Sequence, residues 1–176
     1  MIPSYSCTAH HEAAHAVVAW WLGYDVVSIE MYDEQTQKQG RDGQMRYHFP
    51  VLKSKRLQAA AEIVITWAAP LCERAMGFTD DIEVGPSDAR DIAKRLPELG
   101  DNDEQRTRRA AELGRLAEEI VERYKSGIGA LASALLANGR IIERDEIKHL
   151  LGEPLDPRGA MEVVARRLAE ADLESA

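Results

Sequence analysis

The sequence has few cysteines and fewer basic than acidic residues, and each shortage excludes a class of protein. Two cysteines, Cys7 and Cys72, are too few for a disulfide scaffold, so we expect free thiols in a reducing cytoplasm. The 22 Lys and Arg residues stand against 30 Asp and Glu, which gives a net charge of -8. Such a chain lacks the long-range positive field that attracts nucleic acid or an anionic membrane. We therefore expect no nucleic-acid partner.

Long hydrophobic runs are also missing. No apolar run reaches the ~20 residues that a membrane-spanning helix needs, and the first residues lack the basic start and apolar stretch of a signal peptide. We therefore expect a cytoplasmic protein without a membrane span. A chain of 176 residues can bury a sizeable core. We predict one domain over residues 1–152 and a C-terminal helical tail over residues 153–176.

The most informative motif that is present is His11-Glu12-Ala13-Ala14-His15, which reads H-E-x-x-H in an alanine-rich run. Residues four apart lie on one face of a helix, so His11 and His15 can bind one metal ion. Neutral imidazole nitrogens suit zinc. Glu12 lies beside that face, where its carboxylate can take a proton from a water that the metal activates. The motif predicts a zinc site with two histidine ligands and a glutamate base.

A motif of three fixed positions also arises by chance, and a solvated helix face could carry these side chains without a metal. The surrounding residues favour the metal site, because they predict a helix that packs into a core. We expect Thr8 to be its N-cap and Gly23 to end it after Leu22. His10 points ~100° away from the metal-binding face, so we expect it to flank the site. The apolar stripe consists of Ala14, Val17, Val18, Trp21 and Leu22.

The rest of the sequence predicts a mostly helical α+β domain with a small β-hairpin. Alternation over residues 26–32 and 44–49 predicts two strands joined by a long loop. A helix is expected over residues 53–76, with a kink or break near Ala68-Ala69 because Pro70 removes a backbone hydrogen bond. Two further helices are expected to begin at Ser87 and at a capping box of Asp101 and Glu104, the second running to about Tyr124. Two more are expected over residues 128–137 and 145–151. The tail helix should begin at Asp156-Pro157 and carry Met161, Val164 and Leu168 on one face.

Three blocks of this sequence resemble the peptidase domain of the FtsH family of zinc proteases. Residues 11–29, HEAAHAVVAWWLGYDVVSI, are similar to the family's HEAGHA block and the strand after it. Residues 68–77, AAPLCERAMG, are similar to its helix of small residues followed by Ala-Glu-Glu, and residues 85–93, GPSDARDIA, to its Gly-Ala-Ser-Asn-Asp block. A weaker likeness covers residues 131–151. The resemblance implies an FtsH-like zincin peptidase fold over most of residues 8–152.

The resemblance also implies a third metal ligand, because the aspartate of the family's third block binds zinc. Asp88 matches that aspartate best, and Asp91, three residues further on, is the alternative. Either acid could instead stabilise the N-terminus of its helix. Glu73 matches the first glutamate of the second block and would either orient a ligating imidazole or form a surface salt bridge. The implied zinc ligands are His11, His15 and Asp88.

The family's ATPase domain, with its Gly-rich phosphate loop, and its membrane helices have no counterpart in these 176 residues. The resemblance therefore implies an ATP-independent zinc endopeptidase that cuts unfolded or short polypeptides, or that depends on a separate ATPase unfoldase. The hairpin could offer a strand edge for an extended peptide. Two alternatives are a catalytically silent, zinc-stabilised binding module and a zinc amidohydrolase that acts on a small amide. The intact Glu12 favours an enzyme.

Overall fold

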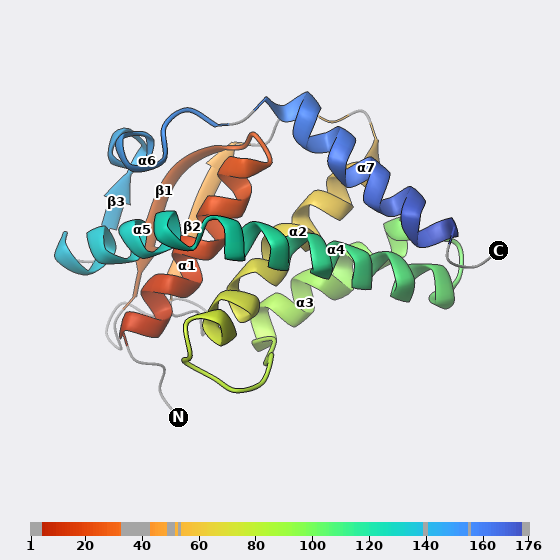
Figure 1. Cartoon of the computed structure of the whole chain (residues 1–176), viewed down its shortest axis with the longest axis horizontal. Helices are drawn as coiled ribbons and strands as arrows, with labels where there is room; N and C mark the ends of the chain where they lie inside the picture. The colour runs from red at the N-terminus through yellow and green to blue at the C-terminus, as the bar shows by residue number, and fades with distance from the viewer. Residues whose placement is uncertain are drawn as a thin grey trace.

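The computed structural model is mostly helical and contains one small sheet, which agrees with the expected α+β class (Figure 1). It describes residues 5–32, 43–48, 52, 54–138, 141–154 and 156–173. The helices are α1 (Tyr5–Trp21), α2 (Lys55–Ala75), α3 (Pro86–Arg95), the short 3₁₀ helix η1 (Leu96–Leu99), α4 (Asp103–Arg123), α5 (Lys125–Ala137), α6 (Arg144–Leu151) and α7 (Pro157–Leu173). The strands are β1 (Asp25–Met31), β2 (Gly43–His48) and β3 (Ile141–Glu143).

The sheet is antiparallel, with β1 in the middle between β2 and β3. The pairing of β1 with β2 ends with Met31 opposite Gly43, so the predicted pairing of these two strands is confirmed. The predicted loop over residues 33–42 and the strand end at Phe49 lie outside the described residues. The sequence analysis did not predict β3, which occupies the other edge of β1. One edge of β2 therefore has no described strand beside it.

Helix α1 is buried in the core, as its apolar stripe predicted. Ala13 and Ala14 are fully buried, and their small side chains let α2 and α5 approach α1 closely. In Figure 1, α1 passes behind α5 and beside the sheet. Gly23, with a φ of 81°, ends the helix as expected. The predicted N-cap was wrong, because α1 begins at Tyr5 and Thr8 is a buried residue within it.

The expectation near Ala68-Ala69 was a kink or a break, and α2 continues through Pro70 without a break. Both alanines and Leu71 are buried, and this packing offsets the backbone hydrogen bond that proline cannot make. Ser54 caps the helix, since its Oγ accepts a hydrogen bond from the backbone N–H of Leu57 at 3.3 Å. Tertiary packing thus keeps α2 continuous over the region in which the sequence predicts a long helix.

Two later helices begin at other residues than predicted. Helix α3 has Gly85 as its N-cap and Pro86 in its first turn, where the absent N–H of proline costs nothing, so Ser87 lies inside the helix. Helix α4 is capped by Asn102, whose Oδ1 accepts a hydrogen bond from the N–H of Gln105 at 2.9 Å. The predicted capping pair was therefore placed one residue too early.

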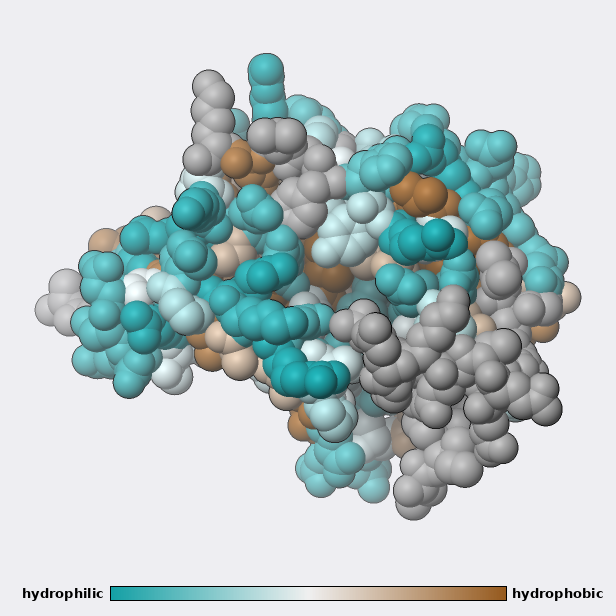
Figure 2. Space-filling view, turned by 180° about the vertical axis from the view of Figure 1, so that it is seen from behind, coloured by the Kyte–Doolittle hydropathy of each residue, from teal (hydrophilic) through white to brown (hydrophobic). Residues whose placement is uncertain are grey.

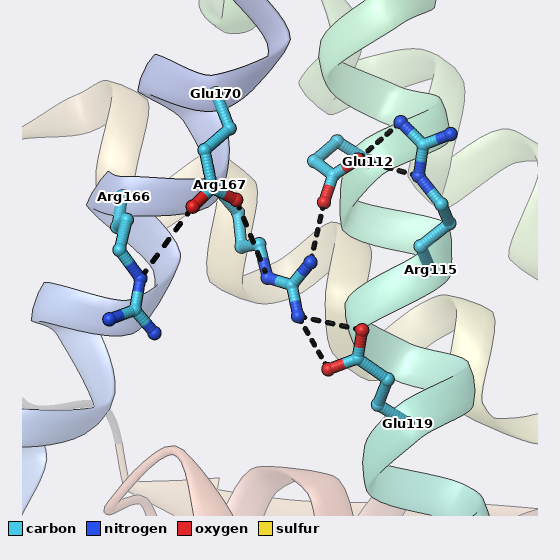
Figure 3. A network of polar contacts seen from close by, with 6 residues as sticks. All are labelled: Glu112, Arg115, Glu119, Arg166, Arg167 and Glu170. Atoms are coloured by element: carbon cyan, nitrogen blue, oxygen red, sulfur yellow. Dashed lines mark hydrogen bonds and ion pairs between the residues drawn. The ribbon is translucent and has the colours of Figure 1, made fainter.

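A network of charged side chains joins α7 to α4 (Figure 3). Arg167 of α7 donates hydrogen bonds to Glu112 at 2.8 Å and to Glu119 at 2.6 Å. Glu112 is buried, and its second oxygen accepts a hydrogen bond from Arg115 at 2.6 Å. Helix α7 also makes an apolar contact with the rest of the protein, because the apolar face predicted for the tail helix is buried. The residues of α7 that belong to the hydrophobic core are Ala160, Met161, Val164 and Leu168.

The face of the molecule turned away in Figure 1 is mostly hydrophilic (Figure 2). Hydrophobic side chains show there mainly in hollows between polar ones. Among the described residues, no helix has both the length and the apolar character required to cross a bilayer.

Candidate metal centre

The two histidines of the H-E-x-x-H motif face each other on α1, with their Nε2 atoms 3.2 Å apart. Each ring is held from its other nitrogen by α2. His15 Nδ1 donates a hydrogen bond to the backbone carbonyl of Ile65 at 2.8 Å, and His11 Nδ1 lies 2.7 Å from a carboxylate oxygen of Glu73. A carbonyl can only accept, so the proton of a neutral His15 is on Nδ1. These two contacts leave both Nε2 atoms available as ligands.

Asp88 joins this pair from the first turn of α3. Its Oδ2 lies 3.4 Å from His11 Nε2, and its Oδ1 lies 3.8 Å from His15 Nε2. The residue is only 7% exposed, and its Oδ2 is a buried oxygen without a hydrogen-bond partner among the described residues. Buried polar atoms are normally paired, so an unpaired carboxylate oxygen next to two imidazoles indicates a missing positive partner.

The ligand atoms of His11, His15 and Asp88 all lie within 4.8 Å of one another, a grouping that could hold a metal ion. Tetrahedral coordination with bonds of ~2.0–2.2 Å separates neighbouring ligand atoms by ~3.3–3.6 Å. The two Nε2 atoms are 3.2 Å apart and Asp88 Oδ2 is 3.4 Å from His11 Nε2, close to that range, whereas Asp88 approaches His15 through its other oxygen, Oδ1, at 3.8 Å. The residues present therefore fit a divalent cation, which would satisfy two imidazole lone pairs and the unpaired carboxylate oxygen together.

The electrostatics of the site favour positive charge between these residues. Burial lowers the pKa of His11, but the hydrogen bond that its Nδ1 donates to Glu73 and the negative charges of Glu12 and Asp88 raise it to about 9. Burial lowers the pKa of His15, and the neighbouring charge of Asp88 opposes this only in part. The carboxylates thus stabilise a cation at this point, either as a proton on His11 or as a metal ion that replaces it.

Glu12 lies beside the histidines at a cavity of about 610 Å³. Its side chain is buried and lies against Gly43, the first residue of β2. Met45 and Tyr47 of the same strand, and Thr66 of α2, also line the cavity. This volume is in the range of ligand-binding pockets. The arrangement brings three potential metal ligands, the Glu12 carboxylate and an edge strand to one opening.

The remaining candidate residues have separate places. Asp91, the alternative third ligand, has a side chain that is 42% exposed and pairs with Lys94 at 3.0 Å, so the structure brings Asp88 rather than Asp91 to the histidines. His10 flanks the site as expected, with its Nδ1 2.8 Å from the carbonyl of Ser6. The two cysteines are free thiols, which confirms that expectation.

The sequence analysis missed two contributors to this site. The carbonyl of Ile65 orients His15, but a backbone carbonyl leaves no signal in a sequence. Gly43 packs against Glu12, yet its place in a polar stretch with Gly40 suggested only a loop. The close contact of Gly43 with another group could have been suspected, because Gly43 directly precedes the predicted strand over residues 44–49 and a glycine at such a position often permits close approach.

Comparison of the chain with protein-family models and with curated proteins finds no match. The resemblance to the FtsH peptidase domain therefore rests on the sequence blocks alone. The candidate site rests on the geometry of His11, His15 and Asp88, which is independent of that resemblance.

Proposed function

We propose that this chain is a zinc-dependent endopeptidase of the FtsH-like type, which hydrolyses peptide bonds of unfolded or short polypeptides. One observation carries the proposal. His11, His15 and Asp88 converge in a buried group, and Glu12 lies next to them at a cavity of substrate size. A purely structural cluster would not need a carboxylate beside the ligands at an open cavity. The same features support zinc as the cofactor.

The donor set supports zinc because two imidazoles and one carboxylate are a common ligand set of catalytic zinc sites, in which a fourth position stays open. When bound, zinc supplies a Lewis acid that lowers the pKa of water and polarises a carbonyl group. The contacts of Glu73 and Ile65 with the Nδ1 atoms fix the orientation of the two imidazoles. Partners of this kind raise both the precision and the strength of metal binding.

In the proposed reaction, Glu12 takes a proton from the attacking water and then passes it to the departing amine nitrogen. A base must lie within about 2.6–3.2 Å of the atom that loses the proton, and the proposal is supported by the burial of Glu12 at the cavity that His11, His15 and Asp88 also line. Glu12 is only 6% exposed, so little of its side chain is in contact with bulk water. His11, His15 and Asp88 hold the reacting centre in place and do not themselves exchange protons with the substrate.

The proposed substrate class rests on the strand edge and on the motifs that these 176 residues do and do not contain. Gly43, Gln44, Met45 and Tyr47 of β2 line the cavity, so we expect an extended polypeptide to lie along this strand. A folded protein is stabilised by about 5–15 kcal/mol, so its chain is rarely extended. The 176 residues contain no Gly-rich phosphate-binding loop. We therefore infer ATP-independent cleavage of unfolded chains in the cytoplasm, with folded substrates requiring a separate ATPase unfoldase.

The test combines metal analysis with digestion of a denatured, alkylated protein by the wild type, Glu12→Gln and Glu83→Gln. Glu83 is an exposed residue that lines the same cavity, so it is the matched control. We expect about one zinc per chain in all three proteins, and a loss of about 10²–10⁴-fold in cleavage rate in Glu12→Gln alone.

Three outcomes would contradict parts of the proposal. Rapid cleavage by Glu12→Gln would show that Glu12 is not the base. A zinc-loaded wild type that cleaves neither proteins nor peptides would favour the binding module. Hydrolysis of small amides without any cleavage of polypeptides would favour the amidohydrolase.

A further inference from the structure

We propose that Gly43 is a positioning residue, which sets the place of the Glu12 carboxylate because it has no side chain. Any side chain at residue 43 would displace that carboxylate from its present position. The catalytic consequence rests on the proposed function, in which Glu12 is the base. The structural part of the proposal, that Gly43 holds Glu12 in place, does not.

The close approach of Gly43 and Glu12 carries the inference. A Cβ atom at residue 43 would lie 2.6 Å from both Cγ and Oε1 of Glu12 and 2.7 Å from its Cδ. Carbon atoms in contact are normally about 3.5–4.0 Å apart. The carboxylate of Glu12 therefore occupies the space that every other amino acid would fill with its Cβ.

The surrounding structure decides which partner would move. The backbone of Gly43 is held by β-pairing with Met31, and the next residue, Gln44, pairs with Glu30. The backbone of Glu12 belongs to a helix whose neighbours Ala13 and Ala14 are fully buried. The Glu12 side chain has three rotatable bonds, so it can move at a lower cost than either backbone. Alanine at residue 43 should therefore be compatible with the fold and should displace the carboxylate.

This displacement should separate two properties of the site. The ligand group consists of His11, His15 and Asp88, and α2 orients the two rings, so metal binding does not depend on Gly43. Proton transfer depends on a distance of about 2.6–3.2 Å, and a shift of about 1 Å in a reacting group costs roughly 10²-fold in rate. Gly43→Ala should retain the metal and lose the function of the base.

The first test follows Glu12 itself in the metal-free protein, by the ¹³C resonance of its carboxyl carbon in glutamate-labelled samples. The resonance is assigned by its disappearance in Glu12→Gln. Gly43→Ala should shift it. The control is Gly159→Ala, because Gly159 lies in α7, is not among the residues that line the cavity, and a Cβ there would have no atom within 4 Å apart from its chain neighbours and its own helix backbone. A resonance that stays unchanged in Gly43→Ala would overturn the proposal.

The second test measures function and metal content together. Gly43→Ala should lower kcat by about 10–100-fold, with zinc content unchanged, and Gly159→Ala should stay within about twofold of the wild type. In a Glu12→Gln background, Gly43→Ala should cause no further loss, because two changes that act through one group are not additive. A further loss of the same size in that background would show that Gly43 acts by another route.

The third test covers the case in which Gly43→Ala is less stable than the wild type. In the double variant, Glu12→Ala removes the atoms that the new Cβ at residue 43 would meet. The double variant should therefore regain the melting temperature that Gly43→Ala alone loses. A destabilisation that persists in the double variant would overturn the proposal. The proposed function fails separately, because a wild type without peptidase activity can still show the expected ¹³C shift.

Discussion

The metal centre and the network between α4 and α7 both contain buried acidic side chains, but they balance the negative charge in different ways. In the network, each carboxylate oxygen of the buried Glu112 accepts a hydrogen bond from a guanidinium group, one from Arg115 and one from Arg167 (Figure 3). At the metal centre, the buried Asp88 faces two imidazoles. Among the described residues, no Lys or Arg lies within ion-pair distance of it, and its Oδ2 has no hydrogen-bond partner.

This difference separates a structural cluster from a binding site. A buried carboxylate that is fully paired with arginines needs no further ligand, and it contributes to stability and to the alignment of two helices. A buried carboxylate that meets only ring nitrogens is left with unsatisfied charge, and such sites are candidates for function. The comparison predicts that variants in the first cluster change stability, whereas variants in the second change metal binding.

Asp88→Asn should have the largest effect, because it removes the charge that distinguishes the metal centre. We expect zinc affinity to fall by more than about 100-fold, since loss of a ligand should exceed the 10–100-fold cost of losing a group that supports one. Asp91→Asn, whose native carboxylate pairs with Lys94, should change the affinity by about twofold or less. Competition with a chromogenic chelator measures the zinc affinity of both variants. Equal losses in the two variants would show that Asp88 is not a special ligand.

Glu73→Gln should be the next largest change. The amide keeps the shape of the side chain but loses the charge that faces His11 Nδ1 at 2.7 Å. We expect zinc affinity to fall by about 10–100-fold in isothermal titration calorimetry. Glu83→Gln is the control, because it removes one negative charge from the same cavity without contact to an imidazole. A similar loss in this control would mean that net charge, rather than orientation of His11, sets the affinity.

Arg167→Met tests the other side of the comparison. It leaves the buried Glu112 with one arginine instead of two, so we expect the free energy of unfolding to fall by about 1–3 kcal/mol. Zinc affinity should not change. Arg166→Met should cost less than about 0.5 kcal/mol, because Arg166 is 65% exposed and its ion pair with Glu170 is 3.9 Å long. Urea unfolding in the presence of a chelator measures both, and equal costs would contradict the prediction.

Asp172→Asn should give the smallest effect, and the effect should depend on pH. The hydrogen bonds from Arg109 hold the pKa of Asp172 below its usual range. A pKa that is lower in the folded state contributes stability above the unfolded pKa of ~3.9, and this contribution is lost as the pH falls through the folded value. The carboxylate is 43% exposed, so water screens the pair, and we expect about 0.5–1 kcal/mol at pH 7. Unfolding measured from pH 7 down to pH 3 should show the difference between wild type and variant shrinking, and a constant difference would contradict this.

The helices show where sequence patterns were informative. Apolar spacing predicted α1 as a buried helix and predicted the face of α7 that packs on the core. It could do so because the apolar residues that recur on one face of a helix are the residues that become buried on folding. Helix ends were less well predicted. Several residues near each end can cap a helix, so Gly85 and Asn102 were overlooked in favour of neighbouring candidates. The three-residue strand β3 was missed because so short a segment has no period of its own and is defined by its pairing with β1.

The sequence by itself determined that His11 and His15 share one face of a buried helix with Glu12 beside them, because a spacing of four residues is a local property of the α-helix. Only the tertiary structure decided how this motif is completed. The groups that orient the two rings lie 62 and 50 residues away, on another helix, and Asp88 comes from a third. The contact of Gly43 with Glu12 was likewise decided by the docking of β2 against α1. Periodicity reports which residues of one element share a face, whereas the distances between elements are set by packing.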